Sequence, residues 1–323
     1  MKYLLLFSLL AFGCDSGSTN RSSDCRMADS ECANGFSCQM NSEDTYVCLR
    51  IGEEQTGGEE PTAGEEPTAG EEPTAGEEPT AGEEPTTGIS WVNIPVGSFM
   101  MGSEESEYES PVHEVTVESF QMSETEVTVG QYRRCVEAGH CSESNIDEEY
   151  NTCTWWALPR GKEDHPINCV DWGQARTFAI WAGGDLPTEA QWEYAARGGE
   201  SYEYAGSDNA DEVAWYDENA GSTKPVSTKR ANGYGLYDMS GNVWEWTLDE
   251  WHSYSDEAPS QAETPWGYIG LCSGMCDSGS SRRVGRGGGW SRGARNLRVG
   301  IRRSLHPVSR RNYLGFRVRR TLP

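Results

Sequence analysis

The sequence has little positive charge. Its 26 Lys and Arg residues stand against 52 Asp and Glu residues, which leaves a formal net charge of −26 over 323 residues. A nucleic-acid-binding protein needs a basic surface that neutralises phosphates, so this composition argues against nucleic acid as a partner. The excess of acidic residues is unevenly distributed along the chain. Residues 51–88 carry twelve Glu and no basic residue, whereas residues 89–323 carry 22 basic and 34 acidic residues, an ordinary balance for a globular domain.

Long apolar runs are also missing. After residue 13 no segment reaches eighteen consecutive apolar residues, so no later stretch is expected to cross a membrane. A ten-residue apolar run follows Lys2, and its length predicts a cleaved export signal over residues 1–13. The run ends in Gly13-Cys14 and resembles a bacterial lipobox. We therefore expect Cys14 to be lipidated and to anchor the protein to the cell envelope, on its periplasmic or surface face; a plain secretory signal is the alternative.

Residues 14–50 lack the apolar content needed for a core of their own. They hold four more cysteines, Cys25, Cys32, Cys38 and Cys48. In an exported segment of this size, disulfides supply the stability that burial cannot. A zinc site would need a close pair such as Cys-x2-Cys, which is absent. We predict a small disulfide module with unspecified pairing.

Residues 51–88 lack any periodic apolar face. They repeat Gly-Glu-Glu-Pro-Thr-Ala with little change five times, up to Thr87. Recurrent proline and repelling glutamates predict a disordered, extended linker that separates the following domain from the membrane. A loose calcium-binding role for the glutamate pairs is the alternative.

The third segment, residues 89–323, contains all twelve tryptophans. Strands are predicted over 89–101 and 113–122. Helices are predicted to begin at Thr128, Asp171 and Thr188, the last two with a glutamine three residues on that completes a capping box. After Gly198 no convincing helix follows for more than a hundred residues. The pattern predicts a loop-rich α+β domain and excludes a doubly wound parallel sheet.

Four segments of this domain together resemble the formylglycine-generating enzyme, or sulfatase-modifying factor, family. They are residues 97–102 with 111–113 and 126–128, residues 186–199 (LPTEAQWEYAARGG), residues 232–246 (NGYGLYDMSGNVWEW), and residues 286–290 (RGGGW) with Gly315-Phe316-Arg317. Their order and spacing cover nearly all of 89–323. The resemblance implies a loop-rich variant of the C-type lectin fold.

The resemblance also implies an oxidase that converts a peptidyl cysteine of a sulfatase to formylglycine, with copper held by two cysteines just after a Gly-Gly-Ser motif. Soft thiolates suit Cu(I). Here residues 287–298 contain no cysteine, Gly289 replaces the motif serine, and arginines stand among the following residues. A guanidinium stays protonated and does not ligate copper. We expect no copper and no catalytic residue, and a ligand cleft around Gly289, Trp290, Arg292 and Arg295.

Six cysteines lie in the domain, an even number that favours structural disulfides in an exported protein. The predicted pairs are Cys135–Cys141, Cys153–Cys169 and Cys272–Cys276. A metal or redox role for Cys272 and Cys276 is the alternative.

Calcium is the cofactor that the resemblance implies most directly. The matching donors are the carboxylates of Asp238 and Glu245 and the backbone carbonyls of Gly241 and Val243, which are hard oxygen ligands. The alternative is that Asp238 only ties a turn through backbone hydrogen bonds. A second family metal site would begin at Asn219 and Ala220, but its downstream acidic partner is missing.

Charge is segregated within the domain. Residues 282–323 contain thirteen Arg and no acidic residue. In one interpretation, arginines such as Arg298, Arg302 and Arg317 form salt bridges with the acidic body of the domain. In the other, an arginine-lined cleft selects an anionic ligand through bidentate hydrogen bonds. Its arginines would be Arg292, Arg295, Arg303, Arg310 and Arg311.

The sequence thus favours a lipid-anchored, non-catalytic binding module with structural calcium, whose partner is an extracytoplasmic protein, peptide or glycan. The alternative is a formylglycine-generating oxidoreductase that acts on sulfatase cysteines. A third possibility is an accessory subunit that holds an active partner at the envelope.

Overall fold

The computed structural model describes residues 87–144, 153–155, 161–254, 262 and 281–322, together with the backbone of two strands at residues 36–40 and 46–50. The chain divides into two compact units, residues 1–76 and 77–323. In the first unit, β1 (Phe36–Met40) pairs antiparallel with β2 (Tyr46–Arg50), and the register places Cys38 opposite Cys48. The predicted lipidation site Cys14 and the predicted disulfide cysteines Cys25 and Cys32 lie outside the described residues.

The second unit consists of short strands and helices joined by long loops. In chain order its elements are β3 (Trp91–Ile94), β4 (Gly97–Met101), β5 (His113–Val117), β6 (Phe120–Ser123), α1 (Val129–Glu137), α2 (Trp172–Trp181), α3 (Glu189–Arg197), α4 (Ala210–Val213), β7 (Trp244–Glu250), β8 (Arg283–Arg286), the 3-10 turn η2 (Ala294–Asn296), β9 (Arg303–Leu305), β10 (Leu314–Gly315) and β11 (Arg319–Thr321).

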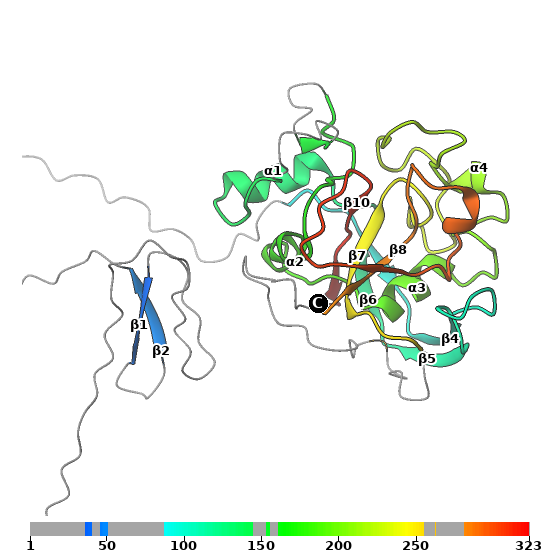
Figure 1. Cartoon of the computed structure of the whole chain (residues 1–323), viewed down its shortest axis with the longest axis horizontal. Helices are drawn as coiled ribbons and strands as arrows, with labels where there is room; N and C mark the ends of the chain where they lie inside the picture. The colour runs from blue at the N-terminus through cyan, green and yellow to red at the C-terminus, as the bar shows by residue number, and fades with distance from the viewer. Residues whose placement is uncertain are drawn as a thin grey trace, which may run out of the picture. The chain divides into compact units, whose positions relative to one another are not determined.

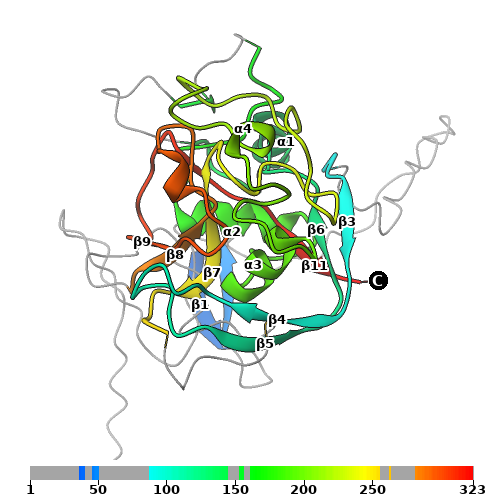
Figure 2. The same ribbon diagram turned by 90° about the vertical axis from the view of Figure 1, so that its right-hand side faces the viewer.

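Three sheets organise this unit. The largest has the strand order β10–β7–β8–β9, with β10 parallel to β7 and the other neighbours antiparallel. A three-stranded antiparallel sheet has the order β11–β6–β3, and β4 pairs with β5. Figure 1 shows α1 and α2 on one side of β7 and β8, with α3, β4 and β5 on the other. Figure 2 shows β3, β6 and β11 together at one edge of the unit. The predicted α+β class is confirmed.

Side-chain caps set the starts of the three longer helices. Thr128, Asp171 and Thr188 each accept a hydrogen bond from the backbone of the glutamine three residues later, and each glutamine side chain accepts one from the cap backbone. This reciprocal arrangement satisfies two of the backbone N–H groups that a helix start leaves unpaired. Helix α3 ends at Gly198, whose φ of 60° lies in the left-handed region that glycine adopts without strain. All three predicted starts are confirmed.

The apolar stripes of these helices form two cores. The first joins α1 and α2 to β7 and β10, and there the ring of Phe178 lies 5.6 Å from Tyr132 and 5.5 Å from Phe316, centroid to centroid. The second packs α3 against β4, β5 and β6 around the fully buried Trp192. Burying one such aromatic side chain contributes about 1.5–3 kcal/mol. The two cores hold the loops after β6 and β8 in place.

The predicted strands are each broken in two. The stretch 89–101 breaks at Pro95-Val96, and the stretch 113–122 breaks at Glu118-Ser119. Proline has no backbone N–H to donate to a neighbouring strand. Across these breaks the chain changes sheets, because β3 pairs with β6 whereas β4 pairs with β5. After Gly198, the only helical elements among the described residues are the one-turn helix α4 and the turn η2. The sequence pattern predicts this absence of longer helices.

Two predicted disulfides are present. Cys135 bonds Cys141, with Cα atoms 5.2 Å apart, and Cys153 bonds Cys169, with Cα atoms 5.9 Å apart. Disulfides of this kind persist outside the cytoplasm, which fits the predicted export. Cys272 and Cys276 lie outside the described residues. In the part of the chain that is described, none of the helices has the length and apolarity needed to cross a membrane.

Candidate ligand-binding site

A glycine turn follows β8. Gly287 and Gly288 have φ values of 90° and 78°, and a Cβ on Gly288 would lie 2.4 Å from the carbonyl oxygen of Asn296. Only glycine fits there. Gly289 differs, because a Cβ on it would meet Asn242 and Trp244 at 3.4 Å, which is ordinary contact. The turn thus brings Gly289 against the start of β7.

The next residue, Trp290, joins this turn to a distant segment. Its backbone N–H donates to the carbonyl of Asn242 (2.8 Å), and its indole N–H donates to the carbonyl of Asn312 (3.1 Å). The same Asn312 carbonyl accepts from the side chain of Asn168 (2.6 Å). Trp290 is half-buried, and these bonds hold its ring at the edge of the predicted cleft.

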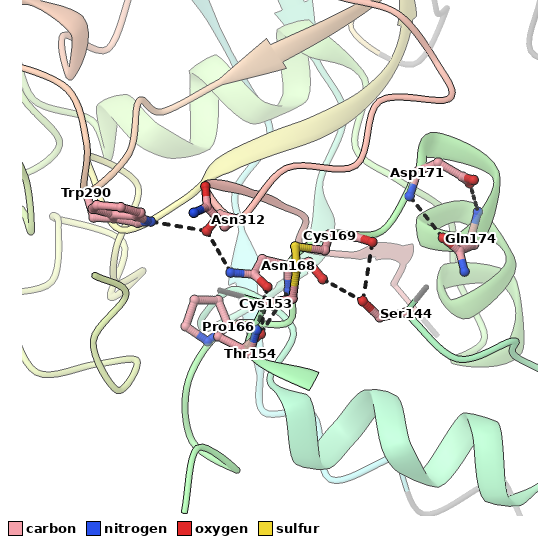
Figure 3. The surroundings of a disulfide bond; sticks show 10 residues. All are labelled: Ser144, Cys153, Thr154, Pro166, Asn168, Cys169, Asp171, Gln174, Trp290 and Asn312. Atoms are coloured by element: carbon pink, nitrogen blue, oxygen red, sulfur yellow. Dashed lines mark hydrogen bonds between the residues drawn. A yellow bond between two sulfur atoms is a disulfide. The ribbon is translucent and has the colours of Figure 1, made fainter. Parts of the chain in front are cut away.

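The Cys153–Cys169 disulfide supports this network (Figure 3). Asn168, the neighbour of Cys169, accepts hydrogen bonds from the backbone (2.8 Å) and hydroxyl (2.9 Å) of Thr154. The backbone N–H of Cys169 lies 3.0 Å from the carbonyl of Arg311 and 3.2 Å from that of Leu314. The disulfide therefore fixes the segment 311–314, which carries Tyr313 into the site.

Two guanidinium groups pack on the ring of Tyr313. Arg292 lies 5.4 Å and Arg303 lies 5.2 Å from its centroid, and Arg303 also lies 5.4 Å from the ring of Trp244. Burial lowers the pKa of Arg303, as do the positive charges of Arg292 and Arg311, while Tyr313 opposes the shift. Among the described residues no carboxylate forms an ion pair with Arg292, Arg303 or Arg311.

The other C-terminal arginines belong to the scaffold. Arg298 pairs with Glu109, Arg302 with Glu189 and Arg317 with Glu245, at 2.7, 2.6 and 2.7 Å. These are the three arginines predicted to form salt bridges, and that interpretation is confirmed for them. Arg310, which the alternative interpretation places in the cleft, forms a salt bridge with Asp171 at 2.6 Å. Arg295 lies exposed on η2, and none of the described contacts joins its side chain to Tyr313.

The candidate calcium residues lie in a buried acidic region. Burial raises the pKa of Asp238 to about 6, with a smaller contribution from Glu245. Asp238 accepts from the backbone of Ser227 through Oδ2 (2.7 Å), while its Oδ1 is buried with no hydrogen-bond partner. Such an oxygen suits a hard cation. Glu245 fits less well, because Arg317 and the indole N–H of Trp192 already donate three bonds of 2.7–2.9 Å to its carboxylate.

Glu126 is a buried carboxylate to which the sequence analysis gave no role. It accepts from the Asn242 side chain (2.7 Å) and from the Val243 backbone (3.0 Å), which fixes the turn between Gly241 and β7. Burial raises the pKa of Glu126 well above its ordinary value, and the charges of Asp238 and Glu245 add to this. In the described ranges no cluster of three or more Asp, Glu, His or Cys side chains has the arrangement of a metal site.

Asn219 and Ala220, where the second metal site is predicted, form local hydrogen bonds. The Asn219 side chain accepts from Tyr216 N (3.0 Å) and donates to Asp211 and to the Ala214 carbonyl (both 3.1 Å), and Ala220 N donates to the Tyr216 carbonyl (2.7 Å). These bonds close the loop after α4.

A pocket of about 430 Å³ is lined by residues 102–103 and 298–300 with Arg197, Tyr202, Glu203 and Asp208 among others, and residues 287–290 are not part of its lining. Its two arginines are already paired, Arg197 with Glu193 and Arg298 with Glu109.

Residues 75–322 match the family model of the sulfatase-modifying factor enzyme 1-like domain. The chain belongs to this family. The formylglycine-generating enzyme of Streptomyces coelicolor is 31% identical over 284 residues, covering 70% of this chain and 87% of that enzyme. The corresponding enzyme of Mycobacterium tuberculosis is 33% identical over 223 residues, covering 50% and 75%. A serine/threonine-protein kinase, pkn1 of Chlamydia caviae, is 34% identical over 240 residues, but these make up only 37% of the kinase.

Solved structures agree on the fold. PvdO from Pseudomonas aeruginosa superposes with a TM-score of 0.61 at 25% identity, covering 77% of this chain and all of that one. Treponema denticola variable protein 1 superposes with a TM-score of 0.58 at 22% identity, covering 72% and 95%. The domain has the loop-rich sulfatase-modifying factor variant of the C-type lectin fold.

Within this family domain, the motifs that carry the resemblance act largely as scaffold. Arg286 of the glycine turn motif is fully buried and pairs with Glu193, Glu245 pairs with Arg317, and Glu126 holds Asn242. All four cysteines whose side chains are described are disulfide-bonded. The sequence offered no signal for Tyr313 or Trp244 as a platform for arginines, since their contacts join segments far apart in the chain.

Proposed function

We propose that this protein is a non-catalytic ligand-binding module of the sulfatase-modifying factor family. The observation that carries the proposal is the make-up of residues 287–298. They contain no sulfur, whereas the resembled oxidases need two thiolates here. They place the Trp290 indole N–H on the Asn312 carbonyl and the Arg292 guanidinium on the Tyr313 ring. Such groups bind and orient a ligand through hydrogen bonds and stacking, whereas they neither hold Cu(I) nor act as a nucleophile at neutral pH.

In this proposal the ligand site around Trp290 is preorganised by hydrogen bonds and a disulfide. Trp290 is bonded to Asn312, and the disulfide-linked Cys169 holds the neighbouring backbone. A preorganised site loses less conformational entropy on binding than a mobile one. The ligand is an extracytoplasmic protein, peptide or glycan in this proposal, and we expect display from lipidated Cys14. Metabolic labelling with a fatty acid tests the anchor, because Cys14→Ser should abolish incorporation.

The rival function is formylglycine formation. The purified protein, supplied with Cu(I) and a sulfatase peptide that contains cysteine, should leave the peptide unchanged in mass spectrometry. The Streptomyces coelicolor enzyme is the positive control, since it carries the name of that activity. Conversion of the peptide cysteine to formylglycine would overturn the non-catalytic assignment.

A structural calcium ion is part of the same proposal. Asp238 would hold it through the unpartnered Oδ1, with the Gly241 and Val243 carbonyls, and Glu245 would contribute only if it shares its oxygens with Arg317. The ion would stiffen the turn between Gly241 and β7, beside Gly289. Calcium titration calorimetry tests this, with Asp238→Asn expected to lose binding and the exposed Asp208→Asn expected to keep it. Equal binding by both variants would contradict the assignment.

A further inference from the structure

The arginines around Tyr313 differ from those elsewhere in the domain. Arg298, Arg302, Arg310 and Arg317 each meet a carboxylate within 2.7 Å. Arg292, Arg303 and Arg311 meet none within the described residues. Asp217 lies beside Gly293, where its carboxylate would be 3.7 Å from a Cβ at that position, yet it forms no ion pair in the described structure. Positive charge is therefore concentrated at these three arginines, although the whole chain has a formal net charge of −26.

Two hydrogen-bond donors in this cluster have no acceptor. The indole N–H of Trp244 and the Nε–H of Arg292 are both enclosed and unpartnered. Trp244 is only 3% exposed, and its ring lies next to Gly289 and 5.4 Å from the guanidinium of Arg303. An enclosed donor without an acceptor costs about 1–3 kcal/mol. The Arg303 guanidinium donates one hydrogen bond, to the Tyr313 hydroxyl (3.4 Å), and among the described residues no other side chain supplies an acceptor to Arg292 or Arg303. The cluster therefore combines positive charge with a shortage of acceptors.

A ligand that fits this cluster carries acceptor-only, negatively charged groups. Carboxylate and sulfate both meet this condition, and both accept two parallel bonds from one guanidinium. The accessibility of the aromatic rings distinguishes a sugar that carries such a group from a peptide that carries it. Arg292 and Arg303 pack on Tyr313, and Arg303 packs on Trp244, which is only 3% exposed. The Trp244 ring is therefore not open to the sugar rings that stack on exposed aromatic side chains. A glutamate or aspartate side chain is slender, and it reaches guanidinium edges without needing a free ring face.

We propose that Arg292 and Arg303, packed on Tyr313 and Trp244 and flanked by Arg311, form an oxyanion subsite that binds side-chain carboxylates of an acidic peptide segment on a partner protein. This inference rests on the proposed binding function, and it names the ligand chemistry of that cleft.

The probe is a capped, fluorescein-labelled peptide with two adjacent glutamates, and the matched control peptide carries glutamines instead. Fluorescence anisotropy with the full chain is expected to show binding of the glutamate peptide that weakens at high salt, because exposed charge interactions are screened. Arg292→Gln and Arg303→Gln should each weaken binding about tenfold or more, as expected for a charge-assisted hydrogen bond. Arg303→Lys should fall in between, because it keeps the charge without the planar fork.

Arg133→Gln is the matched control, since it removes one positive charge from a partly exposed ion pair on α1, outside the cluster. It should bind like the parent protein. Circular dichroism of each variant separates a local loss of binding from unfolding. A second form of the chain, with the twelve glutamates of residues 51–88 changed to glutamine, excludes competition from the protein's own acidic repeats.

Equal binding of the two peptides by this second form, or unchanged affinity in folded Arg292→Gln and Arg303→Gln variants, would overturn the subsite. Binding of a sulfated disaccharide in place of the glutamate peptide would overturn the assignment to a peptide. Neither result contradicts the proposed absence of catalysis. That proposal is contradicted only if the sulfatase peptide is converted to formylglycine.

Discussion

Arg317 and Glu245 form a bidentate ion pair with no solvent exposure of either side chain. Arg317 Nε lies 2.7 Å from Oε2 of Glu245, and Nη2 lies 2.9 Å from Oε1. The pair joins β7 to the segment that follows β10, 72 residues later in the chain. Arg317 also donates to the Tyr237 carbonyl (2.8 Å), so one guanidinium ties together three segments next to the glycine turn.

Removing one partner of this pair should destabilise the domain strongly. Arg317→Met leaves the Glu245 carboxylate buried without its cation, and breaking a buried pair in this way costs about 3–5 kcal/mol. Urea denaturation gives the free energy of unfolding. The control is Arg133→Met on α1, where the pair with Glu163 is partly exposed and should contribute less than about 1 kcal/mol. Equal losses in the two variants would contradict a special role for the buried pair.

The two described disulfides should differ in their contributions. Cys153 and Cys169 are 16 residues apart, whereas Cys135 and Cys141 are 6 apart. The loop-entropy account gives about 3 kcal/mol for the longer loop and about 2 kcal/mol for the shorter one. Replacing both cysteines of each pair by alanine and measuring urea unfolding checks the order. Only loss of Cys153–Cys169 should also weaken ligand binding, because Cys169 holds the backbone of Arg311 and Leu314.

Local sequence patterns predicted the local structure well. Thr128, Asp171 and Thr188 each mark a helix start because the capping contact spans only three residues. Long-range contacts were harder to predict. Nothing near Arg310 in sequence indicates that it pairs with Asp171, 139 residues away, and nothing near Glu126 indicates that it holds Asn242, 116 residues away. The same holds for the cluster of Tyr313, Trp244 and Arg303, which meet only after β7, β9 and the segment before β10 have folded together.

His165 should make stability depend on pH. Its ring is half-buried and bonds the Thr223 hydroxyl (3.0 Å), and burial lowers its pKa to about 4, with Lys162 and Lys224 adding to the shift. Between the ordinary pKa of about 6.5 and this lower value, the unfolded chain takes up a proton that the folded chain does not. Stability from this group is therefore complete above about pH 6.5 and falls as the pH drops towards 4.

His165→Gln should remove that part of the slope, because glutamine does not titrate. The measurement is the free energy of unfolding at several pH values between about 7 and 4.5. His140→Gln serves as the control, since this histidine is exposed. A slope that is the same in parent and His165→Gln proteins would show that other groups dominate this pH range.

The two neighbouring glycines of the turn should respond differently to a side chain. Gly288→Ala combines a left-handed backbone with a Cβ 2.4 Å from the Asn296 carbonyl, and should cost about 1–3 kcal/mol or more. Gly289→Ser faces contacts of 3.4 Å and should change stability by less than about 1 kcal/mol. Gly289→Ser also restores the serine that the family motif carries at this position. The restored hydroxyl supplies no sulfur ligand, so the folded variant should still leave a sulfatase peptide unmodified with Cu(I) present. Formylglycine in that reaction would show that a serine, and not a pair of thiolates, is what this cleft lacks.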